Sequence, residues 1–235
     1  MIRFITATGA DDSVQDIEEM LKISAEYPRV EWGILLSKNN TGAYRFPSLP
    51  WLQKLANKCR ENPGALNLSA HICGSWVREM FLSGNAEIFN FVPMDIFKRV
   101  QFNFHAQSHM VNEGVALGIL KAKFQPYELI FQFDGVNDNL INVCTDSGLK
   151  AYPLFDQSGG AGILPDSWPQ AKGYSGYAGG LSPENVAYEI MQIRQACAGH
   201  DIWIDAETKL RSEGDSLFDL DKVRDYVKNA QPYMG

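Results

Sequence analysis

Cysteines, basic clusters and long apolar runs are all scarce in this sequence of 235 residues. The four cysteines lie far apart without a CxxC pair, which favours neither a disulfide framework nor a zinc ribbon, so we expect free thiols. Lysine and arginine number 21 against 28 aspartates and glutamates, and a net charge of −7 argues against a nucleic-acid partner. No apolar run approaches the roughly 18 residues of a membrane span, so no membrane partner is expected.

Targeting and cofactor signals are also missing. The chain enters strand-like sequence at residue 2 without the pattern of a signal peptide, which predicts a cytoplasmic protein. Gly9 stands alone in the first turn after a strand, where a dinucleotide-binding protein would carry GxGxxG, and no cofactor is predicted. The sequence carries no signal of an oligomeric state.

What the sequence does contain is a regular alternation of short β-like runs with amphipathic helical patterns, which is typical of an α/β protein with a parallel sheet. The length is close to the roughly 250 residues of a (β/α)₈ barrel, so we predict one TIM-barrel domain over residues 1–235. Residues 159–172, rich in glycine and proline, predict an irregular sixth crossover with little helix. Strands are predicted at residues 2–7, 30–36, 66–70, 100–105, 129–133, 150–155, 173–177 and 202–206, and helices at 13–26, 50–60, 75–82, 112–122, 137–147, 183–198 and 217–229.

Polar side chains recur at every second position near the ends of several predicted strands. Since side chains alternate along a strand and barrel enzymes act at the carboxyl ends of their strands, these sets are predicted to point into the barrel mouth. Imidazole and carboxylate groups there also leave open a divalent-metal site, although no HxH or HExxH pair supports it. The sets are Asn67, Ser69 and His71; Gln101, Asn103 and His105; Gln132 and Asp134; and Asp205 and Glu207.

A glycine-rich loop connects the predicted seventh strand to the helix that follows. Gly179 and Gly180 precede Ser182, a plausible N-cap, and Pro183, which suits the first helical position. Exposed backbone N–H groups and the positive end of a helix together bind phosphate, and barrels often hold phosphate after strands seven and eight. We therefore predict a small anionic or phosphorylated metabolite as the ligand.

Several motifs, in order along the chain, resemble those of the phosphoribosylanthranilate isomerase family, (β/α)₈ enzymes of tryptophan biosynthesis. Residues 178–186 read AGGLSPENV against the family's AGGLNPENV, and residues 155–162 read FDQSGGAG where the family has an aspartate and a GGTG loop. Upstream, residues 42–48 are similar to SPRYV and residues 100–105 to VQLHG. The resemblance is strongest from residue 150 to the end.

The resemblance implies an acid/base rearrangement of a sugar phosphate. Asp156 would be the acid that opens the ribose ring, Arg45 would hold a substrate carboxylate, and Gly159, Gly160, Gly179, Gly180, Ser182 and Thr208 would contact substrate or phosphate. The family's catalytic base, a cysteine in the first strand, is absent from residues 3–8, and its phosphate-binding SSG is replaced by residues 206–211. Thr208, Lys209 or Arg211 would then bind the phosphate, and the base would come from Cys73, His71, His105, Asp134 or Glu207.

The predicted function is therefore an isomerase of the aldose–ketose type with changed chemistry. Two alternatives stay open: a metal-dependent lyase or hydrolase using His71, His105, Asp134 and Glu207, and a homologue that binds a phosphometabolite without catalysis.

Overall fold

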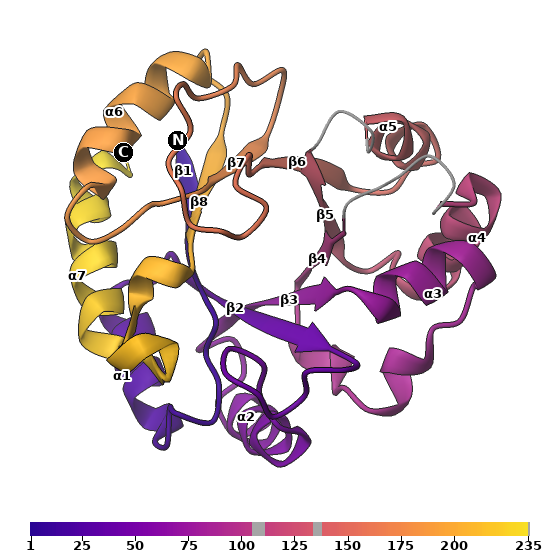
Figure 1. Ribbon diagram of the computed structural model, residues 1–235, viewed down its shortest axis with the longest axis horizontal. Helices are drawn as coiled ribbons and strands as arrows, with labels where there is room; N and C mark the ends of the chain where they lie inside the picture. Colours follow the sequence, from indigo (N-terminus) through magenta and orange to yellow (C-terminus); the bar gives the residue numbers. More distant parts are fainter. Residues whose placement is uncertain (105–110, 134–137, 235) are drawn as a thin grey trace.

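Eight strands form a closed ring in the computed structural model, which describes residues 1–104, 111–133 and 138–234. Each strand pairs in parallel with the next one along the chain, and β8 pairs with β1 (Figure 1). All eight carboxyl ends therefore meet at one rim, and the predicted (β/α)₈ barrel is confirmed. The strands are β1 (Ile2–Thr8), β2 (Val30–Ser37), β3 (Asn67–Cys73), β4 (Arg99–Asn103), β5 (Glu128–Phe133), β6 (Ala151–Phe155), β7 (Ser175–Ala178) and β8 (Ile202–Ala206).

Seven α-helices lie outside the ring, and each overlaps a predicted helix. They are α1 (Ile17–Glu26), α2 (Leu49–Glu61), α3 (Ser75–Ser83), α4 (Glu113–Lys123), α5 (Asp138–Asp146), α6 (Val186–Ala196) and α7 (Leu220–Ala230). Short 3₁₀ turns span Glu87–Asn90, Met94–Ile96, Thr208–Leu210, Glu213–Asp215 and Gln231–Tyr233. No helix among the described residues is long and apolar enough to cross a bilayer.

Three helices, α1, α6 and α7, begin three or more residues later than the sequence predicts. α1 starts at Ile17 rather than residue 13, since Asp16 is the N-cap and accepts from the N–H of Glu18 at 3.0 Å. α7 starts at Leu220 rather than residue 217, because β10 (Leu217–Phe218) pairs antiparallel with β9 (Arg211–Ser212). α6 starts at Val186 rather than Pro183, because the side chains of Ser182 and Asn185 hold the residues before it in a turn.

The sixth crossover is irregular, as predicted. Residues 156–174, all described, contain no helix, and this segment of glycines and prolines forms a long loop between β6 and β7. In Figure 1 it is the orange segment that folds over the barrel opening beside β7 and β8. The loop thus reaches the face on which the strand ends converge.

The layer between barrel and helices is largely aromatic on one side. Phe81 of α3 packs against Phe102 of β4 with ring centroids 5.1 Å apart and against Phe131 of β5 at 6.4 Å. Phe102 and Phe131 stack at 5.3 Å. Rings of this size bury large apolar areas, so these contacts fix α3 onto the outside of the strands.

The barrel interior holds a buried ion pair at its amino-terminal end. Arg99 of β4 donates to Glu31 of β2 at 2.8 Å, and each side chain is 2% exposed. The guanidinium lies over the rings of Phe4 at 4.9 Å and Trp203 at 4.3 Å, contacts that favour a cation. This end of the barrel is filled, so an open site lies at the carboxyl rim.

Candidate active site

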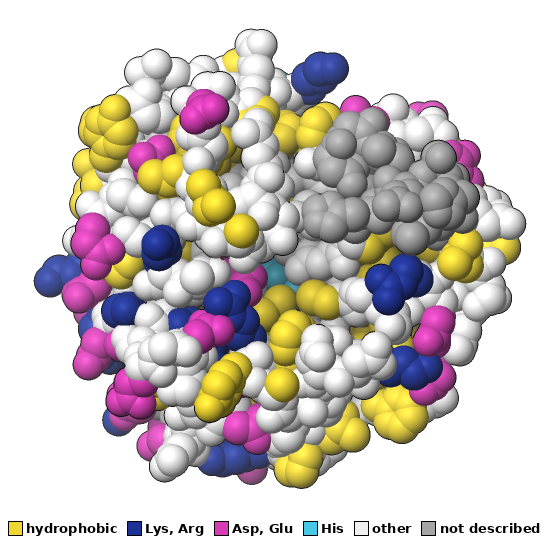
Figure 2. Space-filling view, in the orientation of Figure 1, with side chains coloured by type: hydrophobic (Ala, Val, Ile, Leu, Met, Phe, Trp, Pro, Cys, Tyr) yellow, Lys and Arg dark blue, Asp and Glu magenta, His cyan; other side chains and the backbone are white. Residues whose placement is uncertain are grey.

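A cavity of ≈ 570 Å³, counting its open mouth, lies at the carboxyl rim of the barrel. Figure 2 looks onto this face and shows a hollow near its centre, with a histidine at the floor and charged side chains along the rim. The lining residues are His71, Gln101, Asn103, Gln132, Leu154, Asp156, Ser158, Gly159, Gly160, Gly162, Ala178, Gly179, Gly180, Leu181, Asp205, Ala206, Glu207, Thr208 and Lys209.

The predicted polar face of the strands does point into this cavity. Parallel pairing sets His71 of β3 beside Gln101 of β4, and Cys73 beside Asn103. The polar residues at the amino end of β3 lie elsewhere: Asn67 donates to backbone carbonyls at the opposite end of the barrel. The alternation of side chains along the strands therefore identified the face that points into the barrel. Of the polar residues on that face, those near the carboxyl end of a strand reach the barrel mouth.

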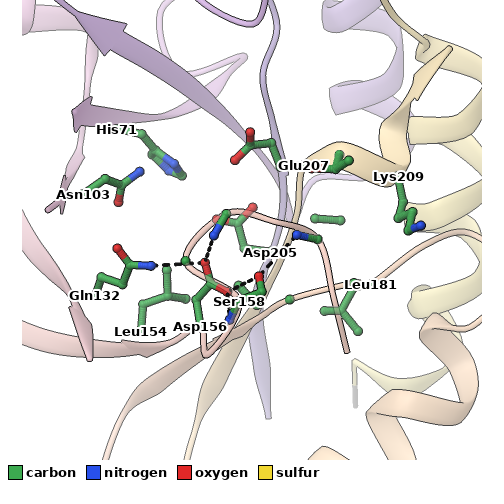
Figure 3. Close-up of a pocket in the computed structure, with 18 of the residues that line it drawn as sticks. His71, Asn103, Gln132, Leu154, Asp156, Ser158, Leu181, Asp205, Glu207 and Lys209 are labelled. Atoms are coloured by element: carbon green, nitrogen blue, oxygen red, sulfur yellow. Dashed lines mark hydrogen bonds between the residues drawn. The ribbon is translucent and has the colours of Figure 1, made fainter. Parts of the chain in front are cut away.

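Asp156 follows β6 and lines the cavity beside its own loop (Figure 3). One carboxylate oxygen accepts from the N–H and hydroxyl of Ser158 at 3.1 and 2.7 Å. The other accepts from the N–H of Gly160 at 2.9 Å and from Gln132 at 3.3 Å. Four donors therefore fix the position of this carboxyl group in the loop.

Asp205 of β8 has the opposite environment. It is 6% exposed, and among the described residues its one hydrogen-bond partner is the hydroxyl of Thr8, at 2.7 Å. Burial raises the pKa of Asp205 well above its usual value, the Thr8 bond opposes this, and the nearby charges of Glu207, Glu31 and Asp156 add to it. Asp205 is thus the carboxyl group most strongly held in its protonated form.

Glu207 lines the cavity from the turn after β8 and is tied to Arg45. The Arg45 guanidinium donates to Glu207 at 2.7 Å and, on its other edge, to Asp215 at 2.7 and 2.9 Å. Burial raises the pKa of Glu207, and the charge of Arg45 opposes that shift. Arg45 was predicted to hold a substrate carboxylate, but its guanidinium is paired with carboxylates of the chain itself and does not line the cavity.

A second arginine continues this network inward. Arg211, 5% exposed, donates to Asp11 at 2.7 Å and to the carbonyl of Gly9 at 2.6 Å. Asp11 in turn accepts from the backbone N–H of Arg45 at 2.8 Å, where φ is +74°. Three carboxylates and two guanidinium groups therefore alternate in one chain of contacts that sets the loops after β1, β2 and β8.

Two of the predicted bases lie in surroundings that oppose that role. Burial, with a smaller contribution from Arg99, lowers the pKa of His71 to about 3. Burial raises the pKa of the Cys73 thiol to about 12, and its sulfur is within reach of the Asn103 amide at 3.6 Å. At neutral pH His71 is therefore an uncharged imidazole and Cys73 an uncharged thiol, so neither is suited to take a proton from carbon.

The glycine-rich turn before α6 is built differently from the sequence prediction. Ser182 accepts from the N–H groups of Glu184 and Asn185 at 3.2 and 3.3 Å, and Asn185 accepts from the Ser182 N–H at 2.8 Å. These side chains hold residues 183–185 in a turn, which is why α6 begins at Val186, with Asn185 rather than Ser182 at the N-cap position. The N–H groups of Ser182, Glu184 and Asn185 are therefore used within the turn.

A recess next to the cavity supplies positive charge from side chains instead. It shares Gly162, Gly180, Thr208 and Lys209 with the cavity, so the two are continuous. Its other lining residues are Ile163, Leu164, Ser182, Glu184, Asn185, Arg211 and Lys222. Arg211 is paired with Asp11 and Asp215, and the two lysines outweigh the single carboxylate of Glu184, so the recess suits an anion.

Gly179 and Gly180 have a packing function in addition to lining the cavity. Gly180 has φ of +67°, and a Cβ there would lie 2.5 Å from the backbone nitrogen of Leu164. Gly179 has φ of +112°, and its Cβ would lie 3.0 Å from the carbonyl oxygen of Ile163. Glycines at these two positions let the β6–β7 loop pass directly over the β7–α6 turn.

The structure brings together most of the predicted site. Ser182 lines the recess, and Arg45 lies beside Glu207. The predicted residues that line the cavity are His71, Asp156, Gly159, Gly160, Gly179, Gly180, Glu207 and Thr208. His105 and Asp134 lie outside the described residues. Within the described part of the chain, no group of three or more His, Cys, Asp and Glu side chains is arranged to hold a metal ion. The four cysteines are free thiols, as predicted.

Three contributors were not selected from the sequence. Asp205 was noted as a polar strand residue, but its burial against Thr8 depends on the pairing of β1 with β8. Ser158 had a local signal, since a serine two residues after an aspartate often closes a turn onto the carboxylate. Lys222 belongs to α7, and no local pattern indicates that it reaches the recess.

Comparison with known proteins gives structural neighbours only. No protein-family model matches the sequence, and no curated protein shows significant similarity to it. The phosphoribosyl anthranilate isomerase of Thermus thermophilus superposes with a TM-score of 0.59 at 12% identity, covering 98% of this chain and 99% of that chain. The phosphoribosyl anthranilate isomerase of Thermotoga maritima gives 0.56 at 14%, covering 99% and 100%.

A third solved structure has a different activity. The truncated 3-deoxy-D-arabino-heptulosonate 7-phosphate synthase of Thermotoga maritima gives a TM-score of 0.55 at 11% identity, covering 99% of this chain and 86% of that chain. At such identities the likeness concerns the fold. The chain has a phosphoribosylanthranilate isomerase-like (β/α)₈ fold, and its chemistry must be argued from its own residues.

Proposed function

We propose that this chain is an acid/base isomerase of a small phosphorylated sugar derivative. The observation that carries the proposal is the meeting of Asp156, Asp205 and Glu207 in one cavity that continues into a positively charged recess. Isomerisation of a sugar needs one group that gives a proton to oxygen and another that takes a proton from carbon. Carboxyl groups in contrasting environments meet that need without a further reagent.

The phosphate end of the substrate is assigned to the recess. Lys209 lines both the cavity and the recess, and Lys222 and Ser182 line the recess. Three N–H groups of the neighbouring turn, those of Ser182, Glu184 and Asn185, are bonded within the turn. In our proposal the two lysines and the side-chain hydroxyl of Thr208 bind the phosphate. The sugar carbons would then extend from the recess into the cavity.

The two proton-transfer roles follow from the surroundings of the carboxyl groups. The resemblance to the isomerase family implied that Asp156 is the acid, but Asp205 is the aspartate of this cavity whose pKa is raised by burial. In our proposal Asp205, buried and protonated, gives its proton to the ring oxygen as the C1–O bond breaks. Asp156 takes the proton from C2, and the electron pair of that C–H bond forms the C1=C2 double bond of the enol. Return of a proton to C1, with loss of the proton of the C2 hydroxyl, then gives the ketose. Glu207 is the alternative base.

The test measures turnover and binding separately in Asp156→Asn and Asp205→Asn. Both variants are expected to lose at least about 100-fold in turnover of 5-phosphoribosylamine or ribose 5-phosphate while retaining phosphate-dependent binding by calorimetry. Asp166→Asn is the matched control, because Asp166 is an exposed carboxylate of the same β6–β7 loop and does not line the cavity. Unchanged turnover in Asp156→Asn would refute the assignment.

Other results would favour the alternatives. Tight binding of phosphorylated sugars without turnover in the wild type would indicate a binding homologue. Turnover that is lost with a chelator and restored by Zn²⁺ or Mn²⁺ would indicate a metal-dependent lyase or hydrolase. Growth of a strain that lacks phosphoribosylanthranilate isomerase, when supplied with this gene, would extend the proposal to tryptophan biosynthesis despite the missing first-strand cysteine.

A further inference from the structure

One wall of the cavity is made of uncharged polar side chains. The wall consists of His71 from β3, Gln101 and Asn103 from β4, and Gln132 from β5, all of which line the cavity. In Figure 3 the labelled members of this group, His71, Asn103 and Gln132, lie across the cavity from Lys209. If phosphate occupies the Lys209 end, this wall faces the other end of the substrate.

The hydrogen bonds within the wall have a defined direction. The Gln101 amide nitrogen lies 2.9 Å from the Asn103 carbonyl oxygen and 3.3 Å from Nδ1 of His71. The Asn103 amide nitrogen lies towards the Cys73 sulfur, so its oxygen faces Gln101, and the Gln101 atom that contacts this oxygen is the NH₂ group. His71 then accepts at Nδ1 and carries its hydrogen on Nε2, as an uncharged ring. No member of this chain of contacts bears a charge.

Gln101 leaves one of its polar atoms without a partner. The residue is 4% exposed, and its Oε1 is buried with no hydrogen-bond partner in the described part of the chain. An unsatisfied buried carbonyl lowers stability unless something in the cavity donates to it. The other amide atoms are committed to Asn103 and His71, so the side chain cannot turn to satisfy Oε1 without losing those bonds.

The chemistry of the wall selects among possible substrate groups. Among the described residues that line the cavity, Lys209 is the one lysine or arginine, and it lies across the cavity from this wall, so a carboxylate here would lack a cation. An aromatic ring would cover polar atoms without bonding to them. A hydroxyl group is uncharged and both donates and accepts hydrogen bonds, so it matches a wall of amide and imidazole groups.

We infer that the wall formed by His71, Gln101, Asn103 and Gln132 binds the hydroxyl groups of a polyhydroxylated carbon chain. This inference rests on the proposed function, because it takes the phosphate end of that chain to lie at Lys209. It makes the substrate a phosphorylated polyol or open-chain sugar, with no aromatic acid at the far end.

The experiment compares three phosphate esters by titration calorimetry: ribitol 5-phosphate, propyl phosphate and phenyl phosphate. The wild type is expected to bind ribitol 5-phosphate at least about tenfold more tightly than the other two, since a site built for hydroxyls discriminates against analogues that lack them. Gln101→Met, which keeps the side-chain length and removes the amide, is expected to abolish this difference while binding propyl phosphate as before. Gln53→Met, at an exposed glutamine of α2, is the matched control.

The outcomes separate this inference from the proposed function. Equal affinities for the three esters, or tighter binding of phenyl phosphate, would overturn the hydroxyl-binding wall and leave the phosphate recess intact. Binding of free ribitol that Gln101→Met abolishes, with no preference for its phosphate ester, would support the wall and contradict the phosphate end of the proposed function. Failure of all these probes to bind would overturn both, and the wild-type ranking decides the matter if the variant does not fold.

Discussion

Individual carboxyl groups in this barrel differ more in their surroundings than in their positions. Asp156 accepts four hydrogen bonds, and Asp205 is buried with one hydroxyl partner. Hydrogen-bond donors favour the ionised form of a carboxyl group and desolvation favours the neutral form. Two aspartates at one cavity therefore differ in hydrogen bonding and in burial, and such contrasting carboxyl groups are what acid/base catalysis uses.

Protonation of Asp205 has a consequence for stability that does not involve substrate. Because the folded-state pKa of Asp205 is raised, its contribution is fully present below about pH 3.8 and is lost as the pH rises through the folded-state value. At pH 7 the unfolded chain gains by ionising Asp205, and an asparagine cannot ionise. We therefore expect Asp205→Asn to raise the melting temperature at pH 7 and to have little effect near pH 3.5.

Calorimetric melting at both pH values measures this difference. Each kcal/mol gained at pH 7 should raise the melting temperature by about 2–4 °C in a chain of this size. Asp166→Asn, at an exposed position, should show no such dependence on pH. A variant that is less stable than the wild type at pH 7 and equal to it at pH 3.5 would mean that Asp205 is ionised in the folded protein.

At the scale of elements, the β6–β7 loop and the β7–α6 turn act as a unit. The loop carries Asp156, and its segment around Leu164 lies directly on Gly180. A side chain at Gly180 would meet the loop backbone, and its φ of +67° is unfavourable for any residue with a Cβ. The position of the loop, and with it part of the cavity wall, depends on this glycine.

Gly180→Ala is expected to destabilise the protein by about 2–4 kcal/mol, from the strained φ and the backbone contact together. Urea unfolding measures the loss. Gly173→Ala is the matched control: it lies in the same loop, and an added Cβ would find nothing within 4 Å, so it should be close to neutral. Equal effects of the two substitutions would show that the contact between loop and turn contributes nothing.

The sequence predicted the existence of the strands and helices better than the residues at which the helices begin. Hydrophobic periodicity located all eight strands and seven helices, and the glycines and prolines of residues 159–172 indicated the irregular crossover. The two-residue strands β9 and β10 were missed, because two residues carry no periodicity and their pairing depends on a turn around Gly214. The start of α6 was misplaced because Ser182 forms a turn of its own before the helix.

The site was also predicted only in part, where local sequence patterns indicate it. Alternation along the strands identified the face that carries His71, Gln101 and Asn103, which is a local property. Which carboxyl group is buried, and which arginine is already paired, depends on contacts between residues far apart in sequence. Thr8 and Asp205 are 197 residues apart, and Arg45 and Asp215 are 170 apart. Such pairings follow from barrel closure and are not visible in a single sequence.

For the whole molecule, the two ends of the barrel divide stability from function. The amino-terminal end is filled by the Arg99–Glu31 pair between Phe4 and Trp203, and the carboxyl end is open and acidic. Removing one partner of a buried pair leaves an uncompensated charge, which costs about 3–5 kcal/mol. The closed end is therefore expected to support the strands on which the site is built.

Glu31→Gln is expected to lower the free energy of unfolding by about 3–5 kcal/mol with little change in ligand affinity at the opposite rim. Glu128→Gln is the matched control, since Glu128 is 34% exposed and lies 3.7 Å from the same guanidinium, and it should cost less than about 1 kcal/mol. Similar losses in the two variants would contradict the role assigned to the Arg99–Glu31 pair.

In the proposed function, the open end of this barrel removes the C2 proton of a phosphorylated sugar. Proton NMR of ribose 5-phosphate in D₂O, with wild-type protein and with Asp156→Asn, tests this most directly. The wild type is expected to replace the hydrogen at C2 with deuterium well above the rate without protein, and Asp156→Asn is not. Ribose 5-phosphate that binds to the wild type and keeps its C2 hydrogen would contradict the claim.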